Sequence, residues 1–389
     1  MVKRLFVPAE GVSNIELFYD LIFVHCISVL TSLVRHVPES GFPSMDTWIM
    51  YFFSFCVVLQ VWFFTTLLMN RYGERSIVDA ACMFANMFLL YFLSNGIRAD
   101  WKGTQHVFLI AWALILANLI LHWVIKLFRY TNLDDDDRKI MRWNIATLAV
   151  QLAIVVVTAF LPTLPSVIAA WGALLFGIVA WRQPKVYAAK PSRFSHICER
   201  CSLLTIIAFG EAVVAIAPYT TQTSSIVYPV FVFVLVVGLF LIYIFEQDNM
   251  IDHHARIDGM AYMTITSWMV VVIGTLTVAL EFMVMRNVEF MPKNILLVGC
   301  LFAYLLTSFL LGRYNKPEFR YSALYVAGRL GTCAFIVAVA VVTNFDPLIT
   351  LICDTGAVYF ALCHEWILYR RRSGKLSFGH SLDYTDEDE

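Results

Sequence analysis

The chain has 389 residues, of which 60% are hydrophobic and only 15% are charged, and its formal net charge is −1. Because a soluble protein keeps about a quarter of its residues charged, this composition excludes an ordinary soluble globular protein. The near-zero net charge gives no reason to expect a nucleic-acid partner. We therefore interpret the chain as an integral membrane protein that contacts the lipid bilayer.

Twelve apolar stretches are long enough to cross a membrane as helices. A span needs about 20 apolar residues, because the hydrocarbon core of a bilayer is about 30 Å thick. Pro162 and Pro165 separate the fifth stretch from the sixth, and Asp346 and Pro347 help to separate the last two. The sequence therefore predicts an all-α, polytopic membrane helix bundle of about 12 spans, near residues 15–34, 47–69, 77–97, 105–125, 143–161, 166–181, 197–217, 225–245, 259–283, 294–312, 322–343 and 347–368.

The distribution of Lys and Arg orients these spans. Short cytoplasmic loops collect basic residues. With a cytoplasmic N-terminus, 21 of the 28 Lys and Arg residues fall on the cytoplasmic side and 5 on the opposite side. This asymmetry predicts a multi-pass protein of the cell membrane with both termini in the cytoplasm. No cleavage site follows the basic start of the chain, so the first span is predicted to be an uncleaved anchor.

The parts outside the spans are short. Residues 134–137 read as a solvated acidic loop, and the tail 373–389 is too polar and acidic to fold. The nine cysteines are spread through apolar segments, which favours helix packing over a disulfide framework or a metal centre. No nucleotide-binding or hydrolase motif is present. We expect no cofactor and no bound metal.

The two halves of the chain resemble each other. A shift of 185 residues aligns the turn at 158–162 with the turn at 343–347, which share the pattern Thr-x-Phe-x-Pro, and aligns Trp181 with Trp366. Six spans per half is an even number, so both halves enter the membrane from the same side. The sequence predicts two parallel six-helix repeats, 1–182 and 183–372, although chance similarity between apolar helices is the alternative.

The first span carries two acids and a histidine. Glu16 and Asp20 are four residues apart, which places them on one face of a helix, and His25 projects roughly opposite Glu16. Ionisable groups inside a span are costly and need a partner, water or a function. The structural alternative is a helix N-terminus that accepts acids through its dipole.

The seventh span carries Glu199 and Arg200 at its start and Glu211 twelve residues after Glu199. Twelve residues correspond to about 18 Å along a helix, so Glu211 is predicted to lie deep in the bilayer. Gly210 beside it leaves room for a close helix or a ligand. Glu211 is the best single site candidate, and one interhelical hydrogen bond from a protonated carboxyl is the alternative.

Four further charged residues are secondary candidates. Arg329 lies inside the eleventh span and is predicted to pair with an acid from another helix. Asp79 and Asp258 match across the repeat, although both also fit helix-capping roles. The acids available to pair with Arg329 are Asp354, Glu16 and Glu211.

Two other motifs are weaker. Cys198 and Cys201 have the spacing of a redox motif but begin a membrane helix. A group of acids and histidines could bind a divalent ion, but a solvated loop is the preferred interpretation; it comprises Glu246, Asp248, Asp252, His253 and His254.

The charged motifs resemble those of the bacterial low temperature requirement A family. The stretch 15–24, Ile-Glu-Leu-Phe-Tyr-Asp-Leu-Ile-Phe-Val, resembles the family's opening signature. Glu199-Arg200 followed by Gly210-Glu211 resembles a second signature, and Asn70-Arg71 with Asp79 resembles a weaker third. The resemblance implies that Glu16, Asp20, Glu199, Arg200 and Glu211 are functional, and it implies no substrate.

The leading functional hypothesis is a transporter or ion channel, including a proton-linked one, with a path between the two halves. Parallel duplication and buried acids favour it, and its partner would be a proton, a small ion or a small solute. The first alternative is a non-catalytic membrane sensor or assembly factor. The second is an intramembrane enzyme that acts on lipid with His25, His122 or His364, but we expect no enzyme because no catalytic constellation is recognised.

Overall fold

The computed structural model describes most of the chain, and every structural statement below concerns the described residues alone. They are 11–36, 41–98, 100–180, 184–187, 190, 192–218, 226–255, 257, 259–285, 288–342 and 346–373. Asp258, Trp181, Thr343, Phe345 and the tail from 374 onward lie outside them. In the described part all regular elements are helices, which confirms the predicted all-α bundle.

Eleven of the described helices are long and apolar enough to cross a membrane, by length and composition. Most of their ends lie within a few residues of the predicted ones; the eleventh predicted span, 322–343, is helix Ala323–Val342. The twelfth long helix, α8 (Phe194–Ile216), has 23 residues and carries Glu199, Arg200 and Glu211. α8 is as long as many of the eleven, but every stretch of it that could cross a membrane contains these three charged residues, which sets it apart from them.

The chain forms two compact units. Unit 1 comprises Met1–His36, Pro43–Ile207 and Arg256–Ser267, and unit 2 comprises Val37–Phe42, Ala208–Ala255 and Trp268–Glu389. Helices α8 and α11 (Met260–Val284) each begin in unit 1 and end in unit 2. The superposition of residues 1–182 on residues 183–372 stays a prediction.

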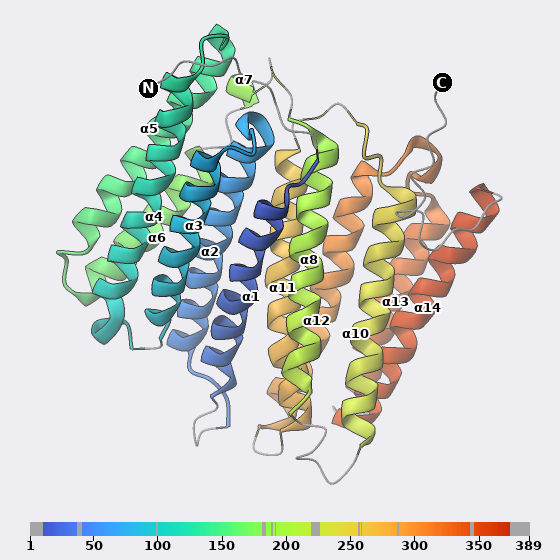
Figure 1. The fold of residues 1–389 in the computed structure, drawn as a ribbon. Coiled ribbons are helices and arrows are strands. Elements are labelled where there is room, and N and C mark those ends of the chain that lie inside the picture. The colour runs from blue at the N-terminus through green and yellow to red at the C-terminus, as the bar shows by residue number, and fades with distance from the viewer. Residues whose placement is uncertain are drawn as a thin grey trace. The chain divides into compact units, whose positions relative to one another are not determined.

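Unit 1 is built from six long helices and the short α7 (Pro184–Tyr187), with the first turns of α8 and α11. The long helices are α1 (Asn14–Arg35), α2 (Met45–Tyr72), α3 (Ile77–Asn95), α4 (Trp101–Arg129), α5 (Asp135–Thr158) and α6 (Thr163–Ala180), which run as neighbouring rods in Figure 1.

Polar caps define where five of these helices begin. The residue before each helix accepts a hydrogen bond from a backbone N–H of the first turn, as an N-cap side chain does. These caps are Ser13, Ser44, Ser76, Asp100 and Asp134. In α1, α3 and α5 an acid at the third helical position bonds back to the cap, which completes a capping box. Glu16 and Asp79, two of these acids, therefore stabilise helix starts as well as being candidate site residues.

A polar contact inside unit 1 depends on a glycine. The Gln151 side-chain amide donates to Gln60 Oε1 at 2.7 Å, which joins α5 to α2. Gly177 of α6 lies against this pair, and a Cβ there would lie 2.3 Å from Gln60 Nε2. A side chain at position 177 would therefore force these two amide groups to move.

Unit 2 contains α10 (Val227–Phe245), α12 (Phe290–Leu311), α13 (Ala323–Val342), α14 (Pro347–Ser373) and the later turns of α8 and α11. The short turns η1 (Glu246–Met250), η2 (Gly312–Tyr314) and η3 (Pro317–Phe319) follow α10 and α12. Phe245, Met250 and Phe319 form a buried cluster against Leu362, Trp366 and Tyr369 of α14.

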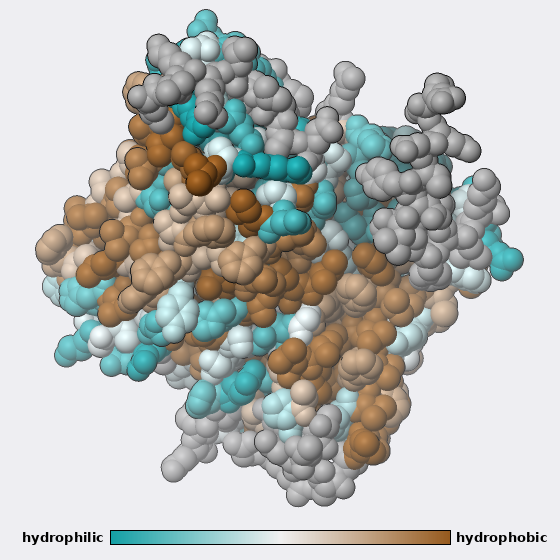
Figure 2. Space-filling view, in the orientation of Figure 1, coloured by the Kyte–Doolittle hydropathy of each residue, from teal (hydrophilic) through white to brown (hydrophobic). Residues whose placement is uncertain are grey.

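Apolar side chains lie on the outer faces of the helices (Figure 2). On α3, Phe84, Phe88 and Phe92 recur every four residues and are 45%, 63% and 46% exposed. A soluble protein rarely leaves such a stripe in water, whereas lipid chains solvate it without cost. These faces fit an integral membrane protein.

Candidate functional site

Helices α1 and α8 bring four buried ionisable residues together inside unit 1. Glu16 lies beside His196, and Asp20 lies beside Arg200. Both pairs are separated by 180 residues, so α1 and α8 run parallel with their N-terminal ends together (Figure 1). The four side chains are each at most 4% exposed. We call Glu16, Asp20, His196 and Arg200 the α1–α8 cluster.

Glu16 is oriented by the start of α1. Its Oε2 accepts from the Ser13 backbone N–H and from the Ser13 hydroxyl, each at 2.9 Å. The other oxygen, Oε1, lies 3.3 Å from His196 Nε2 and 3.9 Å from Arg200 Nη1, and it makes no hydrogen bond among the described residues. Glu16 therefore does stabilise the N-terminus of α1, which was the structural alternative from the sequence. Its second carboxylate oxygen nevertheless faces α8.

Asp20 and Arg200 form the closest ion pair of the cluster. Arg200 Nη2 donates to Asp20 Oδ1 at 2.8 Å, and the indole N–H of Trp62 donates to the same oxygen at 3.1 Å. Within the described structure, Asp20 Oδ2 and Arg200 Nε and Nη1 have no hydrogen-bond partner. The pair thus retains capacity to bind a further group.

Asn70 sets the tautomer of His196. Arg193 N–H donates to Asn70 Oδ1 at 3.1 Å, which fixes the amide orientation, so the Asn70 NH₂ group faces His196 Nδ1 at 3.3 Å. Because an amide NH₂ only donates, Nδ1 accepts and a neutral His196 carries its proton on Nε2. Nε2 is the ring nitrogen that lies 3.3 Å from Glu16 Oε1.

Sequence reasoning missed His196 and Trp62. His196 precedes Arg200 by four residues, as Glu16 precedes Asp20, and this matching spacing was an available signal. Trp62 offered no signal, because one indole among many on an apolar helix has no distinguishing pattern.

Glu199, which the family resemblance implied is functional, lies outside the α1–α8 cluster. Its side chain is exposed. Successive helix residues project about 100° apart. Since Arg200 points into the cluster, Glu199 points away from it. Its place in the second turn of α8 lets the carboxylate reach water near the helix end.

Glu211 lies in the part of α8 that belongs to unit 2, and it is 5% exposed. Gly210 beside it is exposed, and a Cβ built there would meet open space. The close helix approach suggested for Gly210 is therefore not observed among the described residues. Glu281 of α11 is another fully buried acid of unit 2, which the sequence analysis did not single out.

Asp79 belongs to a second buried group of unit 1. Its Oδ1 lies 2.8 Å from His122 Nε2 and 2.6 Å from Lys126 Nζ, both on α4. Its Oδ2 accepts from the backbone N–H groups of Glu74 and Ser76. Both carboxylate oxygens of Asp79 therefore have hydrogen-bond partners within the protein. This arrangement suits a structural role better than ligand binding. His122 and Lys126 are four residues apart, a signal that sequence reasoning did not use.

His25 lies apart from the α1–α8 cluster. Its Nε2 is 3.0 Å from the Ser94 hydroxyl of α3, and its ring stacks on Tyr91 with centroids 5.4 Å apart. These contacts join α1 to α3. Asp258, another of the secondary candidates, lies outside the described residues.

The expected partners of Arg329 were wrong. Arg329 Nη2 lies 2.5 Å from Glu246 and contacts Glu365, all within unit 2. Glu246 had been interpreted as part of a solvated loop, but α10 continues into η1 and buries it to 5% exposure. Asp354 is fully buried, and neither of its oxygens has a hydrogen-bond partner in the described structure.

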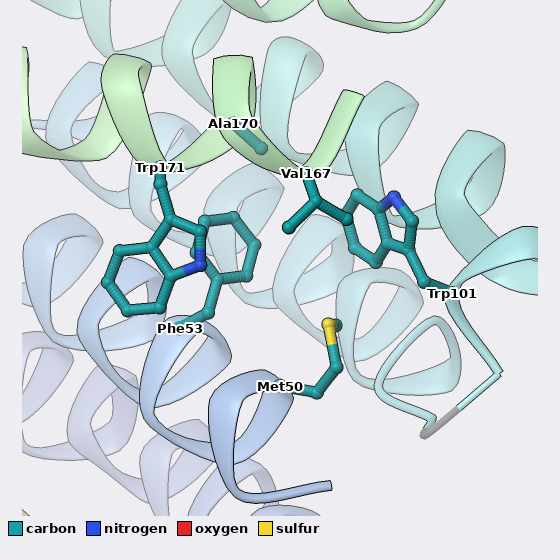
Figure 3. Close-up of a pocket in the computed structure, with 6 residues that line it drawn as sticks. All are labelled: Met50, Phe53, Trp101, Val167, Ala170 and Trp171. Atoms are coloured by element: carbon teal, nitrogen blue, oxygen red, sulfur yellow. The ribbon is translucent and has the colours of Figure 1, made fainter. Parts of the chain in front are cut away.

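Two surface recesses lie away from these charges. The first is lined by aromatic and aliphatic side chains of unit 1 (Figure 3), namely Met50, Phe53, Trp101, Val167, Ala170 and Trp171. The second, of about 320 Å³, lies between α12 and α13 and is lined by apolar residues such as Phe302 and Val337. Neither lining contains a charged side chain.

Comparison with known proteins gives one match. The model of the family described as bacterial low temperature requirement A protein matches residues 11–362 of the chain. The search of curated proteins found no match.

Proposed function

We propose a transport role for this integral membrane protein, which belongs to the bacterial low temperature requirement A family. In this role the protein moves a proton, a small ion or a small solute across the cell membrane. The α1–α8 cluster is its proton-binding site, with Glu16, Asp20 and His196 as the groups that accept the proton. Arg200 is the fixed positive charge of the site.

The charge of the cluster is the observation that carries this proposal. Within the cluster, two carboxylates and one guanidinium leave a net charge of −1 when His196 is neutral. The half-buried Arg193 adds an electrostatic interaction with Glu16 from outside the cluster. Charged groups at most 4% exposed are costly in a low-dielectric environment unless they are balanced. One added proton, on His196 or on an acid, makes the cluster neutral. Histidine is suited to this exchange because its unperturbed pKa lies near physiological pH.

The geometry also supports a change of partners on protonation. Arg200 is 2.8 Å from Asp20 and 3.9 Å from Glu16, so one guanidinium faces both acids. Protonation of Asp20 would remove its attraction for Arg200 and favour the Glu16 contact. Because α1 and α8 supply the two sides of the cluster, this exchange would alter the contact between these helices.

Glu211 is a separate candidate for proton binding, in the part of α8 that belongs to unit 2. It lies eleven residues beyond Arg200 on α8, about 16 Å further along the helix axis. If it takes part in proton movement, its neutral variant should also lose flux. Glu211→Gln belongs in the same transport measurements as the cluster variants.

Neutral substitutions in the cluster are expected to abolish proton movement. Glu16→Gln and Asp20→Asn keep the shape of each side chain and remove its charge. We expect each variant to fold and insert normally, and to lose at least about tenfold in rate, the effect of about 1.4 kcal/mol. The rate is measured in reconstituted vesicles with an enclosed pH-sensitive dye and an imposed membrane potential.

Asp136→Asn is the matched control, because Asp136 is an exposed acid in the first turn of α5. It should transport like the unmodified protein. Normal proton flux at normal protein yield in both Glu16→Gln and Asp20→Asn would contradict the assigned site. Absence of flux in the unmodified protein would contradict proton transport itself.

We further propose that both termini lie in the cytoplasm. This orientation follows from the distribution of Lys and Arg and requires α6 to cross the membrane. Reporter fusions at residues 163–165 and within 183–195 should therefore report opposite sides. A result that places both fusions on one side would refute the topology.

A non-catalytic membrane factor is the second candidate function. The Asp79 group favours it, because its hydrogen bonds are complete and join α3 to α4 without an open position. On this alternative the α1–α8 cluster would only hold helices together. Its neutral variants would then lower protein yield without a specific loss of flux.

A further inference from the structure

Unit 2 contains a buried pair of carboxyl groups that the proposed transport site does not include. Glu246 lies in η1 at the end of α10, and Glu365 lies on α14. Both are within helices long and apolar enough to span a membrane. Their side chains meet around Arg329 of α13, and Glu246, Glu365 and Arg329 are 5%, 1% and 4% exposed.

Glu246 is held by several donors. Its Oε1 accepts from Arg329 Nη2 at 2.5 Å and from the Tyr325 hydroxyl at 3.2 Å. Ser308 of α12 lies 2.8 Å and 2.6 Å from its two oxygens. Side chains of two helices, α12 and α13, therefore hold this carboxylate in position.

Glu365 completes the pair in a different manner. Its Oε1 contacts Arg329 Nη2, the same nitrogen that Glu246 Oε1 contacts, so the two carboxyl groups lie close together. Neither of its oxygens accepts a hydrogen bond of normal geometry from the described residues. Two ionised carboxylates are both acceptors and cannot bond to each other, so a bond between them requires one proton.

Charge counting leads to the same requirement. Two ionised acids and one guanidinium would leave an unbalanced negative charge in a buried position, which is strongly unfavourable. Arg329 is the one cation that the described contacts place on the pair. The other titratable side chains with electrostatic interactions in this group include no acid that is ionised at pH 7; they are Tyr304, Tyr321, Tyr325, Cys333 and His364.

We propose that Glu246 and Glu365 form a proton-binding site that holds one shared proton, with Arg329 as its fixed counter-charge. The site lies wholly within unit 2 and is independent of the transport role proposed for the α1–α8 cluster. Two carboxyls that share one proton are an established arrangement for acids held in close contact.

Infrared spectroscopy of the purified full-length protein at pH 7 tests this assignment. A protonated carboxyl has a carbonyl stretch that an ionised carboxylate lacks, and this band shifts on exchange into D₂O. Glu246→Gln and Glu365→Gln each leave one acid to pair with Arg329, so both variants should fold. We expect one carboxylic-acid component of the unmodified protein to be missing from both variants.

Asp354→Asn is the control, because Asp354 is a buried acid of α14 outside the pair. It should leave the shared component unchanged. Retention of that component in both glutamine variants would show that both acids are ionised and would overturn the proposal. Two separate components, one lost with each variant, would overturn the sharing of a single proton.

Discussion

Replacing Arg200 with alanine is expected to lower the free energy of unfolding by about 3–5 kcal/mol, because it leaves buried charges without their partner. Arg200 is fully buried and is the cation of a cluster that contains Glu16 and Asp20. Without it, the Trp62 N–H would be the remaining hydrogen-bond donor to Asp20 among the described residues. Unfolding in mixed detergent micelles measures the change.

The double variant Arg200→Ala with Asp20→Asn separates charge from packing. Since the asparagine carries no charge to leave unpaired, the double variant should be more stable than Arg200→Ala alone. Arg142→Ala is the control; Arg142 is exposed on α5, so the expected change is within about 0.5 kcal/mol. A loss of less than about 1 kcal/mol in Arg200→Ala would show that the cluster is not held by this ion pair.

Replacing Asp79 with alanine is expected to destabilise the protein by a similar amount, about 3–5 kcal/mol. Asp79 accepts from both His122 and Lys126, and Lys126 is 1% exposed. Its removal leaves the Lys126 ammonium with the Tyr130 hydroxyl at 3.2 Å and a longer-range attraction to Glu74. The capping box at the start of α3 is lost as well. The free energy of unfolding is measured in the same detergent system.

Lys126→Met in the Asp79→Ala background should recover part of this stability, because it removes the unpaired cation and keeps an apolar chain of similar length. Asp46→Ala is a suitable control, since Asp46 is an exposed acid in the first turn of α2 and should cost at most about 1 kcal/mol. If the double variant were less stable than Asp79→Ala, the assigned pairing of Asp79 with Lys126 would be wrong.

The charged groups around Arg200 and Arg329 are alike in their acids and arginine, but the sequence predicted the members of the first far better than those of the second. Each combines two acids with one arginine, and in each an aromatic side chain lies near the guanidinium: Trp62 with Arg200 and Tyr325 with Arg329. Glu16, Asp20 and Arg200 were recognised because they lie within apolar stretches. Glu246 was not, because it follows an apolar stretch directly and a span end cannot be placed to within one turn from hydropathy.

Helix formation and membrane insertion were determined by the sequence alone. Apolar stretches of about 20 residues in lipid leave the backbone no alternative to a helix, since each N–H and C=O must be satisfied within the segment. The starts of α1 and α3 were likewise determined by the local sequence. Ser13 with Glu16, and Ser76 with Asp79, form capping boxes between residues three positions apart.

The pairing of charges was decided only by the tertiary structure. Asp20 meets Arg200 across 180 residues, and Arg329 meets Glu246 across 83 residues. Hydropathy and spacing identify which side chains need a partner, but they contain no information on which helices become neighbours. That choice depends on side-chain packing between helices, which the apolar surfaces of many spans satisfy almost equally well. Glu199 and Arg200 illustrate the same limit. A rotation of α8 by about 100° about its axis would exchange which of them is buried, and only the packing of α8 against α1 determines which one it is.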